Sequence, residues 1–225
     1  KSLGGEKTSH SPIGWGNVGI GAMALSKLIY DTADWGEHAS HNTGLGLQAG
    51  QLITSGSYNT LIGSRCGKNI TTGTNNSLLG NCCGERINTG RWNTCIGTDS
   101  GPHITSGQKN TCIGTLCGTF LNTGNNNICI GYNSGALSSD WNSSRNILIG
   151  NHATITNSFK THDNQIAIGY GAQAQGQDSV QIGDTNIKSI QFGNFLKIYR
   201  RTDSGQNGAV ILANNNANLT DAFSA

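Results

Sequence analysis

The residues best suited to chemistry in this chain are its seven cysteines, because six of them recur at fixed spacing. The pentapeptide NTCIG ends at Gly97 and again, one repeat later, at Gly114. A cysteine can form a disulfide, ligate a soft metal or act as a nucleophile. Here the count is odd, and a row of equally spaced thiols neither pairs off completely nor converges on one metal ion.

The six cysteines exchange with small or aliphatic residues at equivalent positions of the repeat, and only Cys82 does not. One column contains Cys95, Cys112 and Cys129 with Leu61, Leu78 and Leu148, and another contains Cys66, Cys83 and Cys117 with Ala24, Ala49 and Ala172. We therefore predict that these cysteines fill a core, with no metal and no cofactor. Free thiols also favour assembly in a reducing cytoplasm.

Paired carboxylates are the other candidate for catalysis, since glycosidases hold two of them about 5–9.5 Å apart. The best pairs are Asp34 with Glu37 and Asp99 with Glu85, and neither has a supporting motif. A G-x-S-x-G nucleophile motif with suitably placed His and Asp is absent from the sequence. We predict that the chain is not an enzyme. A glycan-degrading spike is the catalytic alternative, and shortening of a host polysaccharide would reveal it.

An internal repeat organises the chain. Each unit contains a glycine preceded by Ile or Leu, and most units have Asn four residues before that glycine. Successive glycines most often recur at the interval that separates Gly97 from Gly114, and the interval varies toward both ends of the repeat. The columns expected to form ladders include Asn59, Asn76, Asn93, Asn110 and Asn127, with Ile62, Leu79, Ile96, Ile113 and Ile130.

Such a unit is too short for a helix pair and fits one coil of a β-solenoid. We expect a strand of about five residues such as NTCIG, a glycine turn, a second short strand and another turn. Stacked coils pair parallel strands about 4.8 Å apart, so identical residues form ladders. The sequence therefore predicts an all-β, parallel β-solenoid of about ten coils over residues 13–195. A lead-in precedes it over residues 1–12, and a β-hairpin or stalk segment follows over residues 196–225.

The expected strand is apolar on both faces, because the Ile column and the Leu/Cys column alternate along it. A strand of this kind needs cover on both faces. One face can fill the interior of the coil, and the other needs a partner subunit. We therefore expect self-association.

Two kinds of unit carry a resemblance to known families. The stretch NQIAIGYGAQAQGQDSVQIG, residues 164–183, resembles the head repeats of YadA-like trimeric adhesins. The units GSYNTLIGSRCG and GNNNICIGYNSG look like the longer repeats of phage and viral tail fibres, which often precede an endosialidase-type self-cleaving chaperone. The resemblance covers about residues 13–195 and implies a left-handed β-roll assembled as a parallel homotrimer. It also implies that a chaperone following Ala225 would remove itself.

Composition excludes several classes of partner. The net charge of +2 and a charged fraction of 12% give no attraction to nucleic acid. No apolar run approaches the roughly 20 residues that span a bilayer, so we expect no membrane insertion.

Departures from the period mark loops, which is where rigid scaffolds usually present recognition residues. The insertion over residues 27–41 and the stretch LSSDWNSSRN provide most of our candidate receptor-binding residues, which are Tyr30, Trp35, His38, His41, Trp141 and Arg145. The first loop either contacts a receptor or caps the end of the solenoid. Its H-x-x-H pair, His38 and His41, is a weak metal pattern that we interpret as solvated.

Trp92 is the remaining candidate. It shares a column with Tyr58, two coils away, and Lys109 follows it in the same column. Aromatic rings beside polar side chains bind sugars by stacking and hydrogen bonding, and they also pack subunits together. Both interpretations stay open for Trp92 and Tyr58.

The resemblance, together with the free thiols, implies a trimeric tail-fibre or spike segment of a virion, assembled in the host cytoplasm and extracellular afterwards. It would attach to a glycan or protein receptor on the host cell and contact other fibre proteins. A bacterial trimeric autotransporter adhesin head is an alternative. Ice binding is a weaker alternative, suggested by the hydroxyl column Thr72, Thr89, Ser106 and Thr123. Asn88 and Asn122 interrupt the neighbouring column, so the flat, regular threonine array is lacking.

Overall fold

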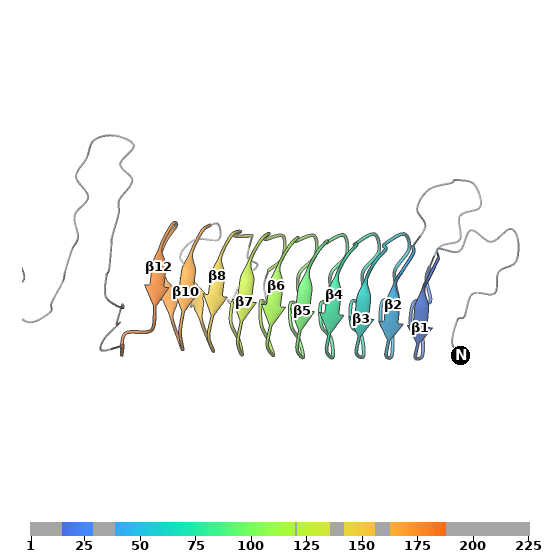
Figure 1. The fold of residues 1–225 in the computed structure, drawn as a ribbon, viewed down its shortest axis with the longest axis horizontal. Coiled ribbons are helices and arrows are strands. Elements are labelled where there is room, and N and C mark those ends of the chain that lie inside the picture. Colours follow the sequence, from blue (N-terminus) through green and yellow to red (C-terminus); the bar gives the residue numbers. More distant parts are fainter. Residues whose placement is uncertain (1–14, 29–38, 120, 136–141, 156–162, 188–225) are drawn as a thin grey trace, which may run out of the picture. The chain divides into compact units, whose positions relative to one another are not determined.

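The computed structural model describes residues 15–28, 39–119, 121–135, 142–155 and 163–187. Figure 1 shows them as stacked coils that each add a short strand to one sheet. Ten strands form this sheet, in chain order, and every pairing is parallel. They are β1 (Val18–Ile20), β2 (Thr43–Leu45), β3 (Thr60–Ile62), β4 (Ser77–Leu79), β5 (Thr94–Ile96), β6 (Thr111–Ile113), β7 (Ile128–Ile130), β8 (Ile147–Ile149), β10 (Ile166–Ile168) and β12 (Val180–Ile182).

The predicted all-β class and parallel β-solenoid are confirmed. The solenoid makes about seven turns, and no helix occurs in the described ranges. The lead-in and the C-terminal segment expected over residues 1–12 and 196–225 lie outside those ranges.

Neighbouring strands pair without any shift, so each residue lies beside its counterpart in the repeat. Cys95 is the partner of Cys112, and Ile96 is the partner of Ile113. The strands have three residues instead of the five expected, because the chain turns at both ends. The residue before the asparagine has a left-handed conformation, and the glycine after the strand has φ near +130°.

The middle residue of each strand points into the coil, which settles which apolar face is internal. Leu61, Leu78, Cys95, Cys112 and Cys129 are buried, whereas the residues on either side of them are partly or largely exposed. Two further columns complete the core. One is the small residue three positions after the glycine, and the other is the aliphatic residue seven positions after it.

The expected second strand is missing from the regular coils. It occurs where the chain forms β9 (Thr154–Ile155) and β11 (Gln173–Ala174), which pair in a separate two-stranded sheet. In the regular coils a glycine such as Gly67 or Gly118 stands four residues after the turn glycine with φ near +57°, which curls the backbone. Thr154 and Gln173 occupy this position in the later coils, and the chain stays extended there.

The turn glycines are stacked directly on one another. A Cβ atom added to Gly97 would lie 2.6 Å from the carbonyl oxygen of Gly114, and φ at Gly97 is +130°. Both the crowding and the backbone conformation exclude a side chain at this position. The invariant glycine column is therefore a requirement of stacking.

Candidate functional site

A ladder of asparagine side chains runs through the solenoid, as predicted. The Asn93 carboxamide donates to the Asn76 side-chain oxygen at 3.0 Å and to the Gly107 carbonyl at 2.9 Å. The backbone N–H and side-chain amide of Asn110 in turn donate to the Asn93 oxygen, both at 3.1 Å. The same pattern joins the buried residues Asn42, Asn59, Asn76, Asn93, Asn110, Asn127 and Asn146.

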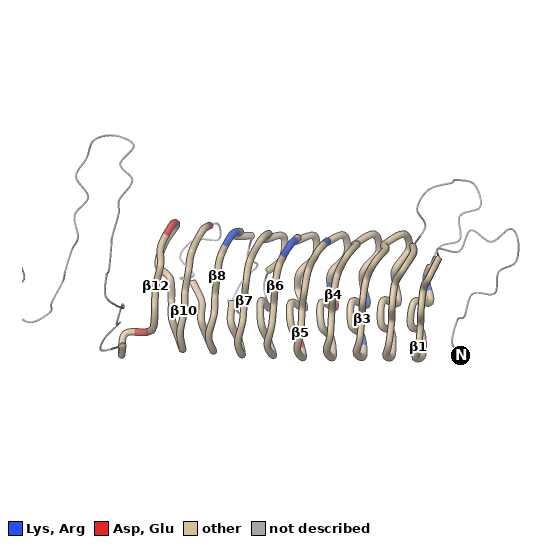
Figure 2. Tube along the Cα trace, in the orientation of Figure 1, with Lys and Arg blue, Asp and Glu red and all other residues tan. Residues whose placement is uncertain are grey.

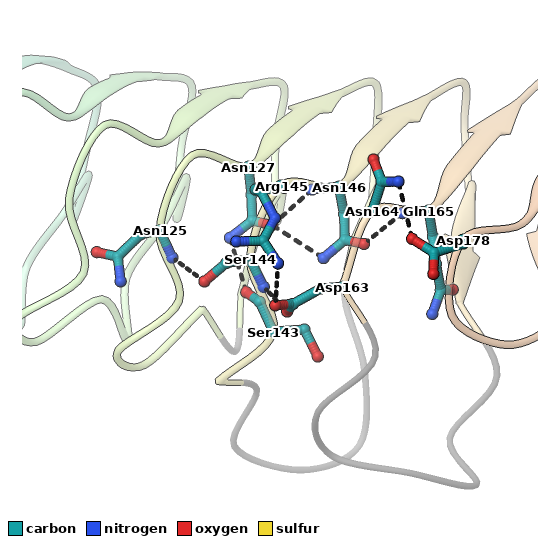
Figure 3. A network of polar contacts seen from close by, with 10 residues as sticks. All are labelled: Asn125, Asn127, Ser143, Ser144, Arg145, Asn146, Asp163, Asn164, Gln165 and Asp178. Carbon is teal, nitrogen blue, oxygen red and sulfur yellow. Dashed lines mark hydrogen bonds and ion pairs between the residues drawn. The ribbon is translucent and has the colours of Figure 1, made fainter. Parts of the chain in front are cut away.

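The ladder ends at Gln165, which follows Asn146 in the column (Figure 3). The backbone N–H of Gln165 still donates to the Asn146 side-chain oxygen at 2.9 Å. Its own carboxamide nitrogen and oxygen are buried and have no hydrogen-bond partner. The extra methylene of glutamine displaces the amide from the position that asparagine would give it.

The thiols of the small column are hydrogen-bond donors as well as core residues. The Cys117 Sγ donates to the Cys129 carbonyl at 2.8 Å, and the Ser100 hydroxyl makes the equivalent bond to the Cys112 carbonyl at 2.9 Å. Sequence reasoning identified these cysteines as buried filler and missed this bond. The signal for it was the presence of serine in the same column.

All seven cysteines are free, and only Cys82 is not buried. Hydrogen bonds to the Cys112 and Cys83 thiols, followed by burial, raise the pKa of the Cys95 thiol well above its ordinary value. No three His, Cys, Asp or Glu side chains of the described ranges are arranged to hold a metal ion. Six of the seven thiols are buried, so this row packs the core and is shielded from solvent.

The exposed residue that precedes each position of the asparagine column, including Gln165 and Ser179 in the last two units, belongs to a second row, which we call the corner row. All its members have a left-handed backbone, with φ between 56° and 62°. The corner row consists of His41, Tyr58, Asn75, Trp92, Lys109, Asn126, Arg145, Asn164 and Asp178. Trp92 and Tyr58 lie two coils apart in it, as predicted, and Lys109 lies beside Trp92.

The aromatic members of the corner row have neighbours of different kinds. His41 and Tyr58 stack with ring centroids 4.9 Å apart and an interplanar angle of 2°. The Lys109 ammonium lies 5.6 Å from the centre of the Trp92 ring. The row thus brings three of the sequence-predicted residues to one edge of the solenoid, namely His41, Trp92 and Arg145.

Arg145 belongs to a polar network between neighbouring coils (Figure 3). Its guanidinium donates to Asp163 at 2.7 Å, and the backbone N–H of Ser144 donates to the other oxygen of Asp163, also at 2.7 Å. The Ser144 hydroxyl accepts from the Asn125 backbone at 3.0 Å. Since Arg145 is already paired with a carboxylate, its guanidinium is less available to a receptor.

A second exposed aromatic group contains two tyrosines, Tyr132 and Tyr170, that were not identified from the sequence. His152 contacts Tyr132 and Tyr170 edge to face, with centroid distances of 5.4 and 6.2 Å. Tyr170 is 71% exposed. The two tyrosines follow turn glycines, in a column that elsewhere contains small, polar or aliphatic residues. Only their place in this column could have indicated the group.

The Ile/Leu column forms an apolar stripe along the outer face of the sheet, which we call the outer stripe. It consists of Ile20, Leu45, Ile62, Leu79, Ile96, Ile113, Ile130, Ile149, Ile168 and Ile182. Seven of these side chains are 36–51% exposed in the single chain. None of the strands in the described part of the chain contains a charged residue, and in Figure 2 these strands have the tan colour of uncharged residues.

Several predicted residues lie outside the described residues, namely Tyr30, Trp35, His38 and Trp141, and so does the Asp34/Glu37 pair. Of the other carboxylate pair, Glu85 forms an ion pair with Arg65. The described residues include no helix long and apolar enough to cross a bilayer.

No family model matches the chain, and neither does any curated protein or solved structure.

Proposed function

We propose that this chain is a segment of a homotrimeric virion fibre that attaches to the host-cell surface without catalysis. The outer stripe is the observation that carries the proposal. A row of half-exposed Ile and Leu side chains with no charge among them is costly to leave in water, at about 25 cal/mol per Å² of apolar surface. Parallel packing of identical chains covers such a row, because each copy has the same stripe at the same height.

The finer features of the proposal come from the repeat and from the resemblance. They are a left-handed β-roll of about ten coils, three parallel copies, assembly in the host cytoplasm and exposure on the virion afterwards. Free, buried thiols are consistent with folding in a reducing compartment. The receptor would be a host glycan or protein, bound by residues at the edges and loops of the fibre.

Multi-angle light scattering on the full chain tests the assembly. We expect a trimer for the wild type and loss of the trimer for Ile113→Lys, because a lysine in the middle of the outer stripe would be buried without a counter-charge. Thr115→Lys is the matched control, since Thr115 is exposed on the adjacent turn, and it should remain trimeric. A wild-type monomer, or an Ile113→Lys trimer of unchanged stability, would contradict the proposal.

Attachment is tested by binding of the trimer to host cells and to a glycan panel, with Trp35→Ala and Trp141→Ala as loop variants. Incubation with host polysaccharides in the same experiment tests catalysis. Chain shortening would replace the attachment proposal with a glycan-degrading enzyme. Absence of binding to every host surface would remove the attachment function.

A further inference from the structure

Two aromatic members of the corner row, His41 and Tyr58, belong to adjacent coils and stack on each other. His41 covers one face of Tyr58 from the preceding coil, with the rings parallel and 4.9 Å apart. The opposite face of Tyr58 is directed toward the next coil, whose corner residue is Asn75. Tyr58 is 51% exposed.

Trp92 presents a ring face to the same coil from the other side. The Lys109 ammonium of the following coil lies over the Trp92 ring, 5.6 Å from its centre. The face that Lys109 does not cover is therefore directed back toward Asn75. Trp92 is 48% exposed, so about half of the residue's surface is accessible to a ligand. Tyr58, Asn75 and Trp92 together form what we call the corner slot.

The width of the corner slot suits a sugar ring. Coils repeat at about 4.8 Å, so rings two coils apart are separated by roughly 9.6 Å. Van der Waals contact with both rings takes about 3.5–4.0 Å on each side. The remaining width accommodates the pucker of a pyranose, whereas a flat aromatic ligand would leave a gap. Aromatic faces commonly bind the C–H faces of sugars in this way.

The floor of the slot supplies hydrogen bonds. Asn75 is exposed, and its backbone N–H donates to the Ser57 carbonyl at 3.0 Å. The Asn75 carboxamide makes no hydrogen bond within the described ranges. Its NH2 group can therefore donate to ligand hydroxyls, and its oxygen can accept from them. A small polar residue between two large rings is the arrangement that a stacked sugar requires.

The backbone conformation supports a binding role for the two rings. Asn75, Asn126 and Asn164 show that asparagine, which tolerates a left-handed backbone, is suited to the corner row. Tyr58 and Trp92 adopt the same conformation, with φ of 59° and 56°, where a bulky side chain is strained. Each also leaves about half of its surface in water. Strain without compensating burial is typical of functional positions.

The charge around the slot selects among sugars. Arg91 and Lys109 are exposed at the Trp92 end, and both are cationic. The corner row and the residues just before it contain no carboxylate from His41 to Lys109. A carboxylate on the ligand would therefore meet positive charge and no repulsion.

We propose that the corner slot binds one pyranose ring of an acidic glycan, between Tyr58 and Trp92 and over Asn75. This inference rests on the proposed attachment function and assigns that function to a specific position on the fibre. It requires no loop residue.

Isothermal titration calorimetry on the full-length trimer tests the proposal with two acidic probes, an oligomer of sialic acid and an oligoglucuronate, and with neutral maltohexaose. We expect binding of at least one acidic probe and at least tenfold weaker binding of maltohexaose. Equal affinity for maltohexaose, or binding of neither acidic probe, would overturn the acidic-glycan assignment.

Two variants locate the site. Trp92→Asn removes one wall and introduces the residue that Asn75 and Asn126 show to fit the row. Asn75→Tyr keeps both walls and fills the slot with a third ring, as His41 and Tyr58 already stack one coil apart. Each should weaken acidic-probe binding at least tenfold while the trimer and its melting temperature are retained. Tyr170→Asn, at an exposed tyrosine of the opposite turn, is the matched control and should bind as the wild type does.

The outcomes separate this inference from the attachment function. If the wild-type fibre binds host cells and Trp92→Asn and Asn75→Tyr bind the probes unchanged, the slot assignment is wrong and attachment stands. If Trp92→Asn breaks the trimer, the rings are subunit contacts and the slot assignment is also wrong. If the wild type binds neither probes nor host cells, the attachment function itself fails.

Discussion

Each internal asparagine of the ladder makes all of its side-chain hydrogen bonds inside a coil whose other buried side chains are mostly apolar. Its oxygen accepts two bonds from the next coil, and its nitrogen donates to the previous coil and to a glycine carbonyl. No other side chain matches this set, because the bonds need an amide at one fixed distance from the backbone. The same geometry explains why glutamine ends the ladder.

Gln165→Asn should therefore stabilise the protein. Asparagine at this position can donate to the Asn146 side-chain oxygen and removes two unpartnered buried atoms. Relief of such a group is worth about 1–3 kcal/mol. Thermal denaturation followed by circular dichroism should show a higher melting temperature.

The reciprocal variant, Asn146→Gln, moves the same break one coil earlier and should lower the melting temperature. An unchanged or lower melting temperature for Gln165→Asn would show that the ladder does not govern stability at this end.

The thiols provide a second test at the residue scale. With Ellman's reagent, one of the seven cysteines should react in the native protein, namely Cys82, and all seven should react after denaturation. Partial desolvation raises the pKa of the Cys82 thiol, so its reaction should be slower than that of free cysteine and should accelerate as pH rises. Cys82→Ser should abolish the native reaction. Several thiols reacting at once in the native state would contradict the buried core.

At the scale of the element, the short strands and tight turns could be predicted from the Asn and Gly columns, because stacking forces identical residues together. The curled segment after each turn could not. A glycine four residues after the turn glycine permits a left-handed backbone, and a sequence pattern does not show whether that freedom is used. The left-handed backbone at Trp92 was equally hidden, because tryptophan rarely adopts it.

Gly97→Ala tests the stacking of the turns. The added methyl group would lie 2.6 Å from the Gly114 carbonyl oxygen at a φ of +130°, so the coils must separate locally. We expect a loss of several kcal/mol, at the upper end for a single substitution. Thr98→Ala, on the exposed neighbouring residue, should change the free energy of unfolding by about 0.5 kcal/mol or less. Equal effects in chemical denaturation would contradict close stacking.

At the scale of the whole molecule, the sequence predicted a strand that is apolar on both faces without showing which face is internal. The structure places the Leu/Cys column inside and the Ile/Leu column outside. Both columns contain aliphatic residues, so hydrophobicity does not distinguish them. The available hint was the range of side-chain sizes in the internal column, which contains cysteines, leucines and the strand glycines Gly19 and Gly44. Residues of different size are tolerated there because neighbouring coils can compensate.

Removal of one whole coil should leave the fold intact. Deletion of Thr98–Gly114 takes out one complete repeat and brings β5 beside β7 with every column in register. We expect an unchanged circular dichroism spectrum, cooperative melting, and a body shorter by about 4.8 Å. The matched deletion of 98–113 keeps Gly114, leaves one residue too many in the turn and should melt at a clearly lower temperature. Equal stability of the two deletions would mean that register is not set at the turn.

The corner row also has an evolutionary consequence. Most of its side chains precede an asparagine that holds two coils together, yet none of the aromatic rings takes part in the asparagine ladder itself. Mutations in this row can therefore change what the surface recognises while the framework beneath is preserved. A lineage under pressure from a changing target would be expected to accumulate its substitutions there, one coil at a time.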